Sequence, residues 1–124
     1  MIHEARYDWK IDGCIDDSID VYPLYQLADY RKLQHIYVDV SLIAHKELDT
    51  IRDTDWRYKE ADVTQPVLLV DGLNNPFNKK YRMVDGRHRL LKLLEQKHHI
   101  VPAFVFSKDD FFKYCEVAHD VSAA

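Results

Sequence analysis

The chain has 124 residues, enough for one domain with its own core, and 47% of them are hydrophobic, which excludes disorder as its general state. Its net charge of −4 at pH 7 excludes a generally basic surface for nucleic acid and is too small to indicate a DNA mimic. We therefore expect a single domain over residues 1–124.

The basic side chains are concentrated in one short stretch. Residues 1–62 carry 14 acidic and 8 basic side chains, a net −6, whereas residues 63–124 carry 7 acidic and 9 basic ones, a net +2. Within residues 79–97, seven basic side chains stand against only Asp85 and Glu95. A local excess of positive charge on an acidic protein indicates a site for an anionic ligand.

The cysteines and the termini bear on where the protein works. Cys14 and Cys115 form no Cys-x-x-Cys motif and no metal-ligand spacing. The first ten residues lack the apolar stretch of a signal peptide, and no apolar run has membrane-spanning length. We therefore expect a cytoplasmic protein with reduced thiols, no metal site and no membrane partner.

The first third of the chain is predicted to hold one helix and one strand. Residues 11–20 alternate apolar and acidic side chains, as a short exposed strand or an ordered loop would. Residues 22–33 repeat leucine and tyrosine at three-residue steps, which predicts a short helix that begins near Pro23. Residues 35–43 are rich in β-branched and aromatic side chains, which predicts a strand.

The middle of the chain is predicted to alternate between regular elements and connections. Residues 45–54 are expected to form a helix, and residues 55–65 a polar linker. The continuous apolar run at 66–72 starts with proline and predicts a buried strand. Residues 73–80 are dense in turn formers and predict an exposed loop.

The last third is predicted as strand, helix, strand and helix. Residues 81–86 alternate as a strand that enters a turn, and residues 87–97 carry the wide leucine face of a helix. Residues 100–106 predict another strand, and residues 108–118 a helix with acidic residues in its first turn, where the helix dipole favours them. The predicted fold class is therefore α+β, a small mixed β-sheet with flanking helices.

The turn that joins a predicted strand to a predicted helix reads Asp85-Gly86-Arg87-His88-Arg89. The first N–H groups of a helix have no partner inside it and lie at the positive end of its dipole, so they attract anions. Gly86 lacks a Cβ, which lets the backbone turn sharply and a ligand oxygen come close. The side chains of Arg87, His88 and Arg89 add donors suited to phosphate oxygens. The sequence thus predicts a phosphate-binding turn.

A purely structural interpretation of the same turn is also open. Asp85 would then be the N-cap of the helix, and the three basic side chains would face solvent. Capping by Asp85 does not compete with phosphate binding. Because cations at a helix N-terminus oppose the dipole, the three basic residues favour the phosphate site.

The segments "PVLLV", "YRMVDGRHRLLKLLEQ" and "IVPAFVF" resemble the ParB/sulfiredoxin superfamily. The resemblance extends over about residues 37–115 and is strongest from 66 to 106. It implies a ParB/sulfiredoxin-like fold with its core at residues 36–118. Residues 1–35 would then be an N-terminal extension, and residues 119–124 a tail.

In sulfiredoxins the turn reads Gly-Cys-His-Arg, and its cysteine is the nucleophile. Arg87 stands at that place in this chain, and Cys115 in the last predicted helix is no evident substitute, so sulfiredoxin activity is not implied. His88 and Arg89 match the positions that, together with the backbone amides of the turn, hold nucleotide phosphates. Gly86 matches the glycine of that turn.

Sulfiredoxins also place a lysine and a threonine for the nucleotide on an earlier helix. The chain reads "HKELDTIR" there, so the resemblance makes Lys46 and Thr50 candidate nucleotide contacts. Their spacing is shorter than in the family. The alternative is that both lie on a solvated helix face.

The turn of ParB itself reads Gly-Glu-Arg-Arg and binds CTP, but this chain lacks the glutamate and the length of a partition protein. In the family's free-serine kinases the turn reads Asp-Gly-His-His-Arg, which differs from residues 85–89 at one position. That match makes Asp85 a candidate general base or magnesium contact. Similar Asp-Gly-Arg-His-Arg turns occur in small phage-encoded proteins described as ParB-like nucleases, which the chain resembles most.

Three functions stay open at this point, and with them the question of whether the protein is an enzyme. The first is a nucleotide-phosphate-binding protein, a Mg-dependent phosphotransferase, NTPase or nuclease that uses ATP or CTP with Mg²⁺. The second is a non-catalytic phage-type protein that uses the same scaffold to bind a host or phage protein. The third is a binder of the nucleic-acid backbone through the basic stretch at 79–97.

Overall fold

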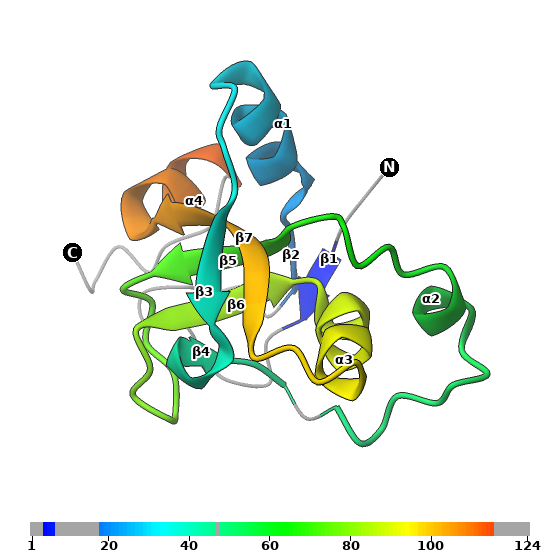
Figure 1. The fold of residues 1–124 in the computed structure, drawn as a ribbon. Helices are drawn as coiled ribbons and strands as arrows, with labels where there is room; N and C mark the ends of the chain where they lie inside the picture. The colour runs from blue at the N-terminus through cyan, green and yellow to red at the C-terminus, as the bar shows by residue number, and fades with distance from the viewer. Residues whose placement is uncertain (1–3, 7–17, 47, 116–124) are drawn as a thin grey trace.

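The computed structural model describes residues 4–6, 18–46 and 48–115. In these residues the chain forms a curled five-stranded mixed sheet, a two-stranded ribbon and four α-helices (Figure 1). This confirms the predicted α+β class with a small mixed sheet and flanking helices. None of the described helices has the length and apolar character needed to cross a membrane.

The main sheet has the strand order β3-β7-β5-β6-β4. Its strands are β3 (Ile36–Asp39), β4 (Ile43–Ala44), β5 (Val67–Asp71), β6 (Tyr81–Asp85) and β7 (Ile100–Ser107). Strand β5 lies at the centre, parallel to β7 and antiparallel to β6. Strand β3 pairs antiparallel with β7 at one edge, and the short β4 pairs parallel with β6 at the other. The separate ribbon pairs β1 (Glu4–Arg6) with β2 (Ser18–Asp20).

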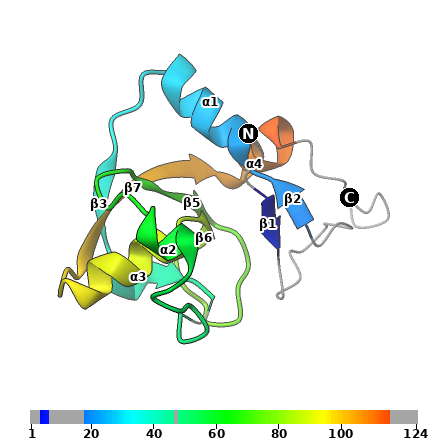
Figure 2. The ribbon, with the colours of Figure 1, turned by 90° about the vertical axis from the view of Figure 1, so that its right-hand side faces the viewer.

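The helices cover both faces of this sheet. They are α1 (Tyr22–Tyr30), α2 (Trp56–Lys59), α3 (Arg87–Glu95) and α4 (Lys108–Tyr114), with a 3₁₀ turn, η1, at Val40–Leu42. Helices α1 and α4 lie together on one side, and α3 and α2 lie on the other (Figure 2).

Strand β5 divides the core between these two layers. Leu68 and Val70 belong to the apolar cluster under α1 and α4, whereas Val67 and Leu69 belong to the cluster under α3. All four are fully buried, because successive side chains of a strand point to opposite faces and helices cover both. This explains the continuous apolar run that predicted β5 from the sequence.

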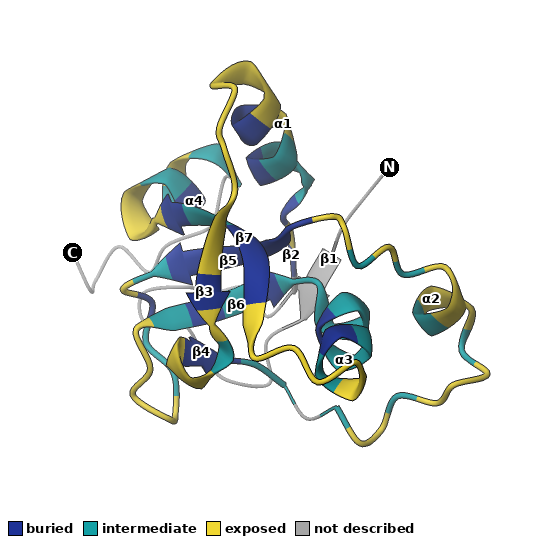
Figure 3. Cartoon of the chain, in the orientation of Figure 1, coloured by how far each residue is buried: buried dark blue, intermediate teal, exposed yellow. Residues whose placement is uncertain are grey.

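Helix α1 is part of this core. Val21 and Leu24 have no exposed surface, and they pack with β5, β7 and α4 in a single cluster (Figure 3). The helix begins with Pro23 in its first turn, as predicted, because proline lacks the N–H that would be unpaired there. The buried apolar side chains of this segment, which the resemblance assigned to an N-terminal extension, therefore belong to the same core cluster as Leu68 and Val70 of β5.

The predicted helix at 45–54 is wrong for the part of that segment that the structure describes. Only isolated turns form there, through Ile51 N–H to the Leu48 carbonyl and Asp55 N–H to the Arg52 carbonyl. The segment is rich in aspartate and threonine, whose side chains compete with helical hydrogen bonds. Asp55 instead accepts a hydrogen bond from Arg57 N–H and caps the short helix α2, inside the predicted linker.

The predicted strand at 35–43 is interrupted. Asp39 ends β3, where its side chain accepts a hydrogen bond from Ser41 N–H and starts the 3₁₀ turn η1. The chain then re-enters the sheet as β4, at the opposite edge. One β-rich stretch thus supplies both edge strands.

Candidate phosphate site

The candidate site is built around Gly86, which joins β6 to α3. Gly86 is the N-cap of α3 and has φ 112° and ψ 17°, a backbone conformation that residues with a Cβ rarely adopt. A Cβ at this position would lie 2.5 Å from Cγ1 and 2.8 Å from Cβ of Val67. The turn therefore requires glycine both for its backbone conformation and for its packing against β5.

The prediction that Asp85 is the N-cap is wrong, because Gly86 occupies that position and has no side chain to cap the helix. Oδ2 of Asp85 accepts hydrogen bonds from the Tyr25 hydroxyl at 2.5 Å and from Nη2 of Arg89 at 3.2 Å. The carboxylate thus connects the end of β6 to the first turn of α3 and to α1.

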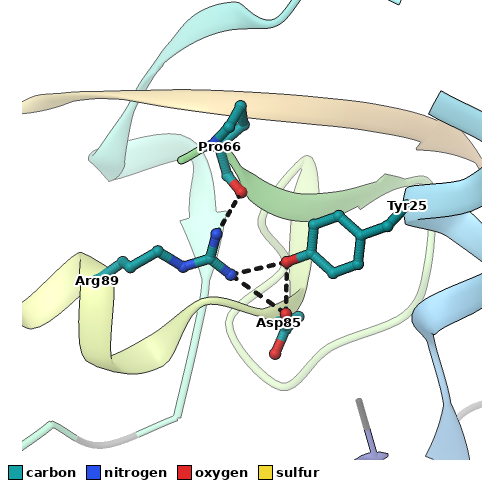
Figure 4. A network of polar contacts seen from close by, with 4 residues as sticks. All are labelled: Tyr25, Pro66, Asp85 and Arg89. Carbon is teal, nitrogen blue, oxygen red and sulfur yellow. Dashed lines mark hydrogen bonds and ion pairs between the residues drawn. The ribbon is translucent and has the colours of Figure 1, made fainter. Parts of the chain in front are cut away.

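Arg89 extends this contact into a network of four residues (Figure 4). Its Nη1 donates to the carbonyl of Pro66 at 2.7 Å, and its Nη2 donates to the Tyr25 hydroxyl at 2.7 Å as well as to Asp85. Only 14% of the Arg89 side chain is exposed. The guanidinium that the sequence offered as a phosphate ligand is therefore bound to three protein oxygens in this structure.

The Tyr25 hydroxyl is the donor to Asp85. Burial, and next the neighbouring Asp85 carboxylate, raise the pKa of Tyr25 well above its ordinary value. The hydroxyl keeps its proton at neutral pH, donates it to Asp85 and accepts from Arg89. Tyr25 thereby fixes helix α1 to the turn.

The other two basic side chains of the turn meet the segment that precedes α2. The guanidinium of Arg87 donates to the hydroxyl of Thr50, and Nε2 of His88 lies 3.7 Å from Oδ2 of Asp55. Burial lowers the pKa of His88 more than the Asp55 carboxylate raises it, so its imidazole is neutral at pH 7. A neutral imidazole contributes a hydrogen bond rather than a charge.

The structure thus brings together some of the residues predicted for the site. Thr50 reaches Arg87, although the helix that was expected to carry Thr50 does not form. Lys46 is partly buried in the same connecting segment, where its carbonyl oxygen lies 2.8 Å from Nδ1 of His45. The sequence patterns did not identify Tyr25 or Asp55 as residues of the site. The only local signal was the position of Asp55 as the N-cap of α2.

The basic side chains of residues 79–97 are less available to an anionic ligand than the sequence suggested. Arg82 is 1% exposed, and its Nη1 donates to the carbonyl of Asn74 at 2.7 Å. Nζ of Lys92 donates to the carbonyls of Lys59 at 3.0 Å and Ala61 at 3.1 Å. Together with the network of Arg89, these contacts direct three of the seven basic side chains toward the protein itself.

Two further features bear on metal binding and on a cysteine nucleophile. In the described ranges no group of three or more histidine, cysteine, aspartate or glutamate side chains is arranged to hold a metal ion. Burial raises the pKa of Cys115 to about 12, so its thiol is protonated at neutral pH and is a poor nucleophile.

No protein-family model, curated protein or solved structure matches the chain. The function therefore has to be inferred from the geometry of the turn.

Proposed function

We propose that the protein binds a phosphate-bearing ligand, a nucleotide such as ATP or CTP with Mg²⁺, at the N-terminus of α3. The observation that carries this proposal is the convergence of Arg87, His88 and Thr50 on a helix start whose N-cap residue has no side chain. Phosphate oxygens accept hydrogen bonds from each of these groups and are attracted by the positive end of the helix dipole.

Each residue has a distinct part in this proposal. Gly86 gives the chain the left-handed turn that opens α3, and the N–H groups of the first helical turn donate to the phosphate. Arg87 supplies a full positive charge with a planar pair of donors, while the neutral ring of His88 and the hydroxyl of Thr50 add directed hydrogen bonds. Lys46 precedes Thr50 along the chain and is the further cation that we assign to the site.

Asp85 and Arg89 are assigned a supporting part. Their contacts with Tyr25 and the Pro66 carbonyl hold the end of β6 against the start of α3, so the turn is formed before a ligand arrives. Arg89, whose charge is paired with the Asp85 carboxylate at 3.2 Å, contributes to phosphate binding through the turn that it holds. In the described residues no group of three or more histidine, cysteine, aspartate or glutamate side chains could hold a metal ion, so Mg²⁺ would enter the site with the phosphates of the nucleotide.

Binding is the activity that this geometry supports best. A phosphotransferase, NTPase or nuclease would need a base, and Asp85, the sequence candidate, accepts hydrogen bonds from Tyr25 and Arg89. We also propose that the chain is a divergent ParB/sulfiredoxin-like protein. The support is the order of β5, β6, the glycine turn, α3 and β7, which is the order that the resemblance implied.

Calorimetric titration tests the proposal, with ATP, CTP and pyrophosphate as ligands, each with and without Mg²⁺. Arg87→Ala should weaken binding by about 1.5–3 kcal/mol, the scale of a hydrogen bond to a charged group, which is roughly 10-fold to 150-fold in Kd. Arg31→Ala is the matched control, since Arg31 pairs with Asp110 between α1 and α4 and its loss changes the net charge equally. Its affinity should equal that of the wild type.

Two results would count against the proposal. One is a wild-type protein that binds none of the three ligands. The other is equal weakening by Arg87→Ala and Arg31→Ala, which would show that only net charge matters. Binding of a DNA duplex that falls steeply with salt would favour the nucleic-acid alternative instead.

A further inference from the structure

Most of the exposed large apolar side chains of the described residues lie in or beside the segment that runs from the end of α1 through β3 to η1. The described residues include eight exposed large hydrophobic side chains, and six of them belong to residues 30–42 or to the position on β7 that pairs with Asp39. These six are Tyr30, Leu33, Ile36, Tyr37, Leu42 and Ile100. Figure 3 shows the exposed stretch that leads from α1 into β3. Such a concentration is typical of an interaction surface.

Strand β3 is an edge strand, with β7 as its one neighbour among the described strands. The register of this pair decides which backbone groups face outward. Val40 N–H donates to the His99 carbonyl at 2.9 Å, and Tyr37 lies opposite Pro102, which has no N–H to donate. Hydrogen-bonded pairs alternate along an antiparallel ladder, so the even-numbered residues of β3 bond to β7. The N–H and C=O groups of Tyr37 and the N–H group of Asp39 therefore point to the open edge.

We propose that β3 pairs antiparallel with β3 of a second copy of this chain, about a two-fold axis at Tyr37. In that register the rings of the two Tyr37 residues face each other. His35 lies opposite Asp39 of the second copy, and Asp39 lies opposite its His35. The outward-pointing N–H and C=O groups of Tyr37 and the N–H group of Asp39 gain partners, and the two sheets join into one. This interface is independent of the proposed phosphate site.

The sequence of β3 is complementary to itself in this register. Aromatic pairs directly across two strands stabilise a sheet, as do polar pairs in which one side chain donates to the other, and the two-fold axis produces the pair of the His35 imidazole and the Asp39 carboxylate twice. A shift of the register by two residues places Tyr37 opposite His35 or Asp39 and removes both polar pairs. The other edge strand, β4, has only two residues and offers no comparable length. The self-complementary pattern of donor, aromatic ring and acceptor along β3 therefore favours a second copy as the occupant of this edge.

Sedimentation velocity over a wide concentration range tests the dimer, which would have twice the 14.7 kDa of the chain. Tyr37→Glu places two carboxylates against each other on the axis and should weaken dimerisation at least tenfold. Trp56→Glu is the matched control, because Trp56 is 67% exposed and Tyr37 is 68% exposed, and only Tyr37 lies on β3. The control should dimerise like the wild type. A wild type that stays monomeric throughout, or equal behaviour of both variants, would overturn the proposal.

Opposite charge changes at one residue test the register. His35→Lys should tighten the dimer and His35→Asp should loosen it, because both act on Asp39 of the second copy. The same two changes at Gln26, exposed on α1, control for net charge and should have no effect. If the changes at His35 and Gln26 have the same effect, the register is wrong.

Amide hydrogen exchange tests the same register at single residues. The N–H groups of Tyr37 and Asp39 should exchange more slowly as the protein concentration rises, because they become bonded in the dimer. The N–H of Val40 is already bonded to His99 and should not respond to concentration. Exchange at Tyr37 that stays fast in the concentrated protein would overturn the paired-edge model.

Discussion

Gly86→Ala is the substitution whose cost the structure defines most closely. The added Cβ would lie 2.5 Å from Cγ1 of Val67, in a backbone conformation with φ 112°. The unfavourable backbone conformation costs roughly 1–3 kcal/mol, and overpacking of a buried contact costs a further 1–3 kcal/mol or so. Gly72→Ala separates the two contributions. Gly72 has φ 86°, but an added Cβ would meet nothing within 4 Å.

We therefore expect Gly86→Ala to lower the free energy of unfolding by about 1–3 kcal/mol more than Gly72→Ala does, which is the overpacking cost alone. Urea denaturation measures both costs, with an unchanged dependence on denaturant showing that the unfolded state is the same. Equal losses for the two variants would refute the packing argument. A Gly86→Ala protein that does not fold at all, beside a folded Gly72→Ala protein, would agree with it.

Val67→Ala provides a second check on the same contact. It removes Cγ1 of Val67, but its Cβ remains 2.8 Å from the added methyl group, so relief should be partial. In the Val67→Ala background, Gly86→Ala should cost less than in the wild type, with a coupling energy of about 0.5–3 kcal/mol. Strict additivity would show that Val67 is not the residue against which the turn packs.

Two further predictions concern the side chains of the site. Tyr25→Phe should lower the free energy of unfolding by about 1–3 kcal/mol, because Asp85 and Arg89 each lose a hydrogen-bond partner. Tyr30→Phe, at a residue that is 86% exposed, should change it by less than about 0.5 kcal/mol. Similar losses for the two variants would show that the hydrogen bonds of the Tyr25 hydroxyl do not stabilise the fold. Burial holds the pKa of His88 below its usual 6.5, so its contribution to stability is complete above that pH and is lost as the pH falls through the folded-state value. The free energy of unfolding should therefore fall more on acidification in the wild type than in His88→Gln, and coinciding pH profiles would show that burial does not shift His88.

Local patterns were sufficient to predict strand β5 and the start of helix α4. The strand predicted at 66–72 is β5 at Val67–Asp71, because its continuous apolar run records burial on both faces. The helix predicted at 108–118 is α4 in the described range. Its start is fixed locally, since Ser107 Oγ accepts a hydrogen bond from Asp110 N–H.

The ends of two helices could not be predicted in the same way. Helices α1 and α3 both end at a residue in the left-handed conformation, Lys32 with φ 52° and Lys97 with φ 64°. In each case the next N–H bonds back five residues, from Leu33 to Ala28 and from His98 to Leu93. This termination usually requires glycine, and the sequence has lysine at both places. Both helices therefore end before the predicted boundary.

The network of Arg89 was hidden for a different reason. Its partners Pro66 and Tyr25 lie 23 and 64 residues away along the chain, so no local pattern connects them. The glycine requirement at Gly86 was visible only in part, because the sharp turn is local whereas the packing against Val67 is not. The supporting contacts of that turn depend on the packing of α1, which no motif records.

The positions of the three consecutive basic residues decide what a ligand at this turn meets. The sequence suggests one cluster of Arg87, His88 and Arg89, but an α-helix turns by about 100° per residue, so their side chains leave it in different directions. Arg87 and His88 point to the segment that holds Thr50 and Asp55, while Arg89 points the other way, to Tyr25. A phosphate at the helix start would therefore be met by the backbone and by Arg87 and His88. Arg89 would act through the turn that it holds in place.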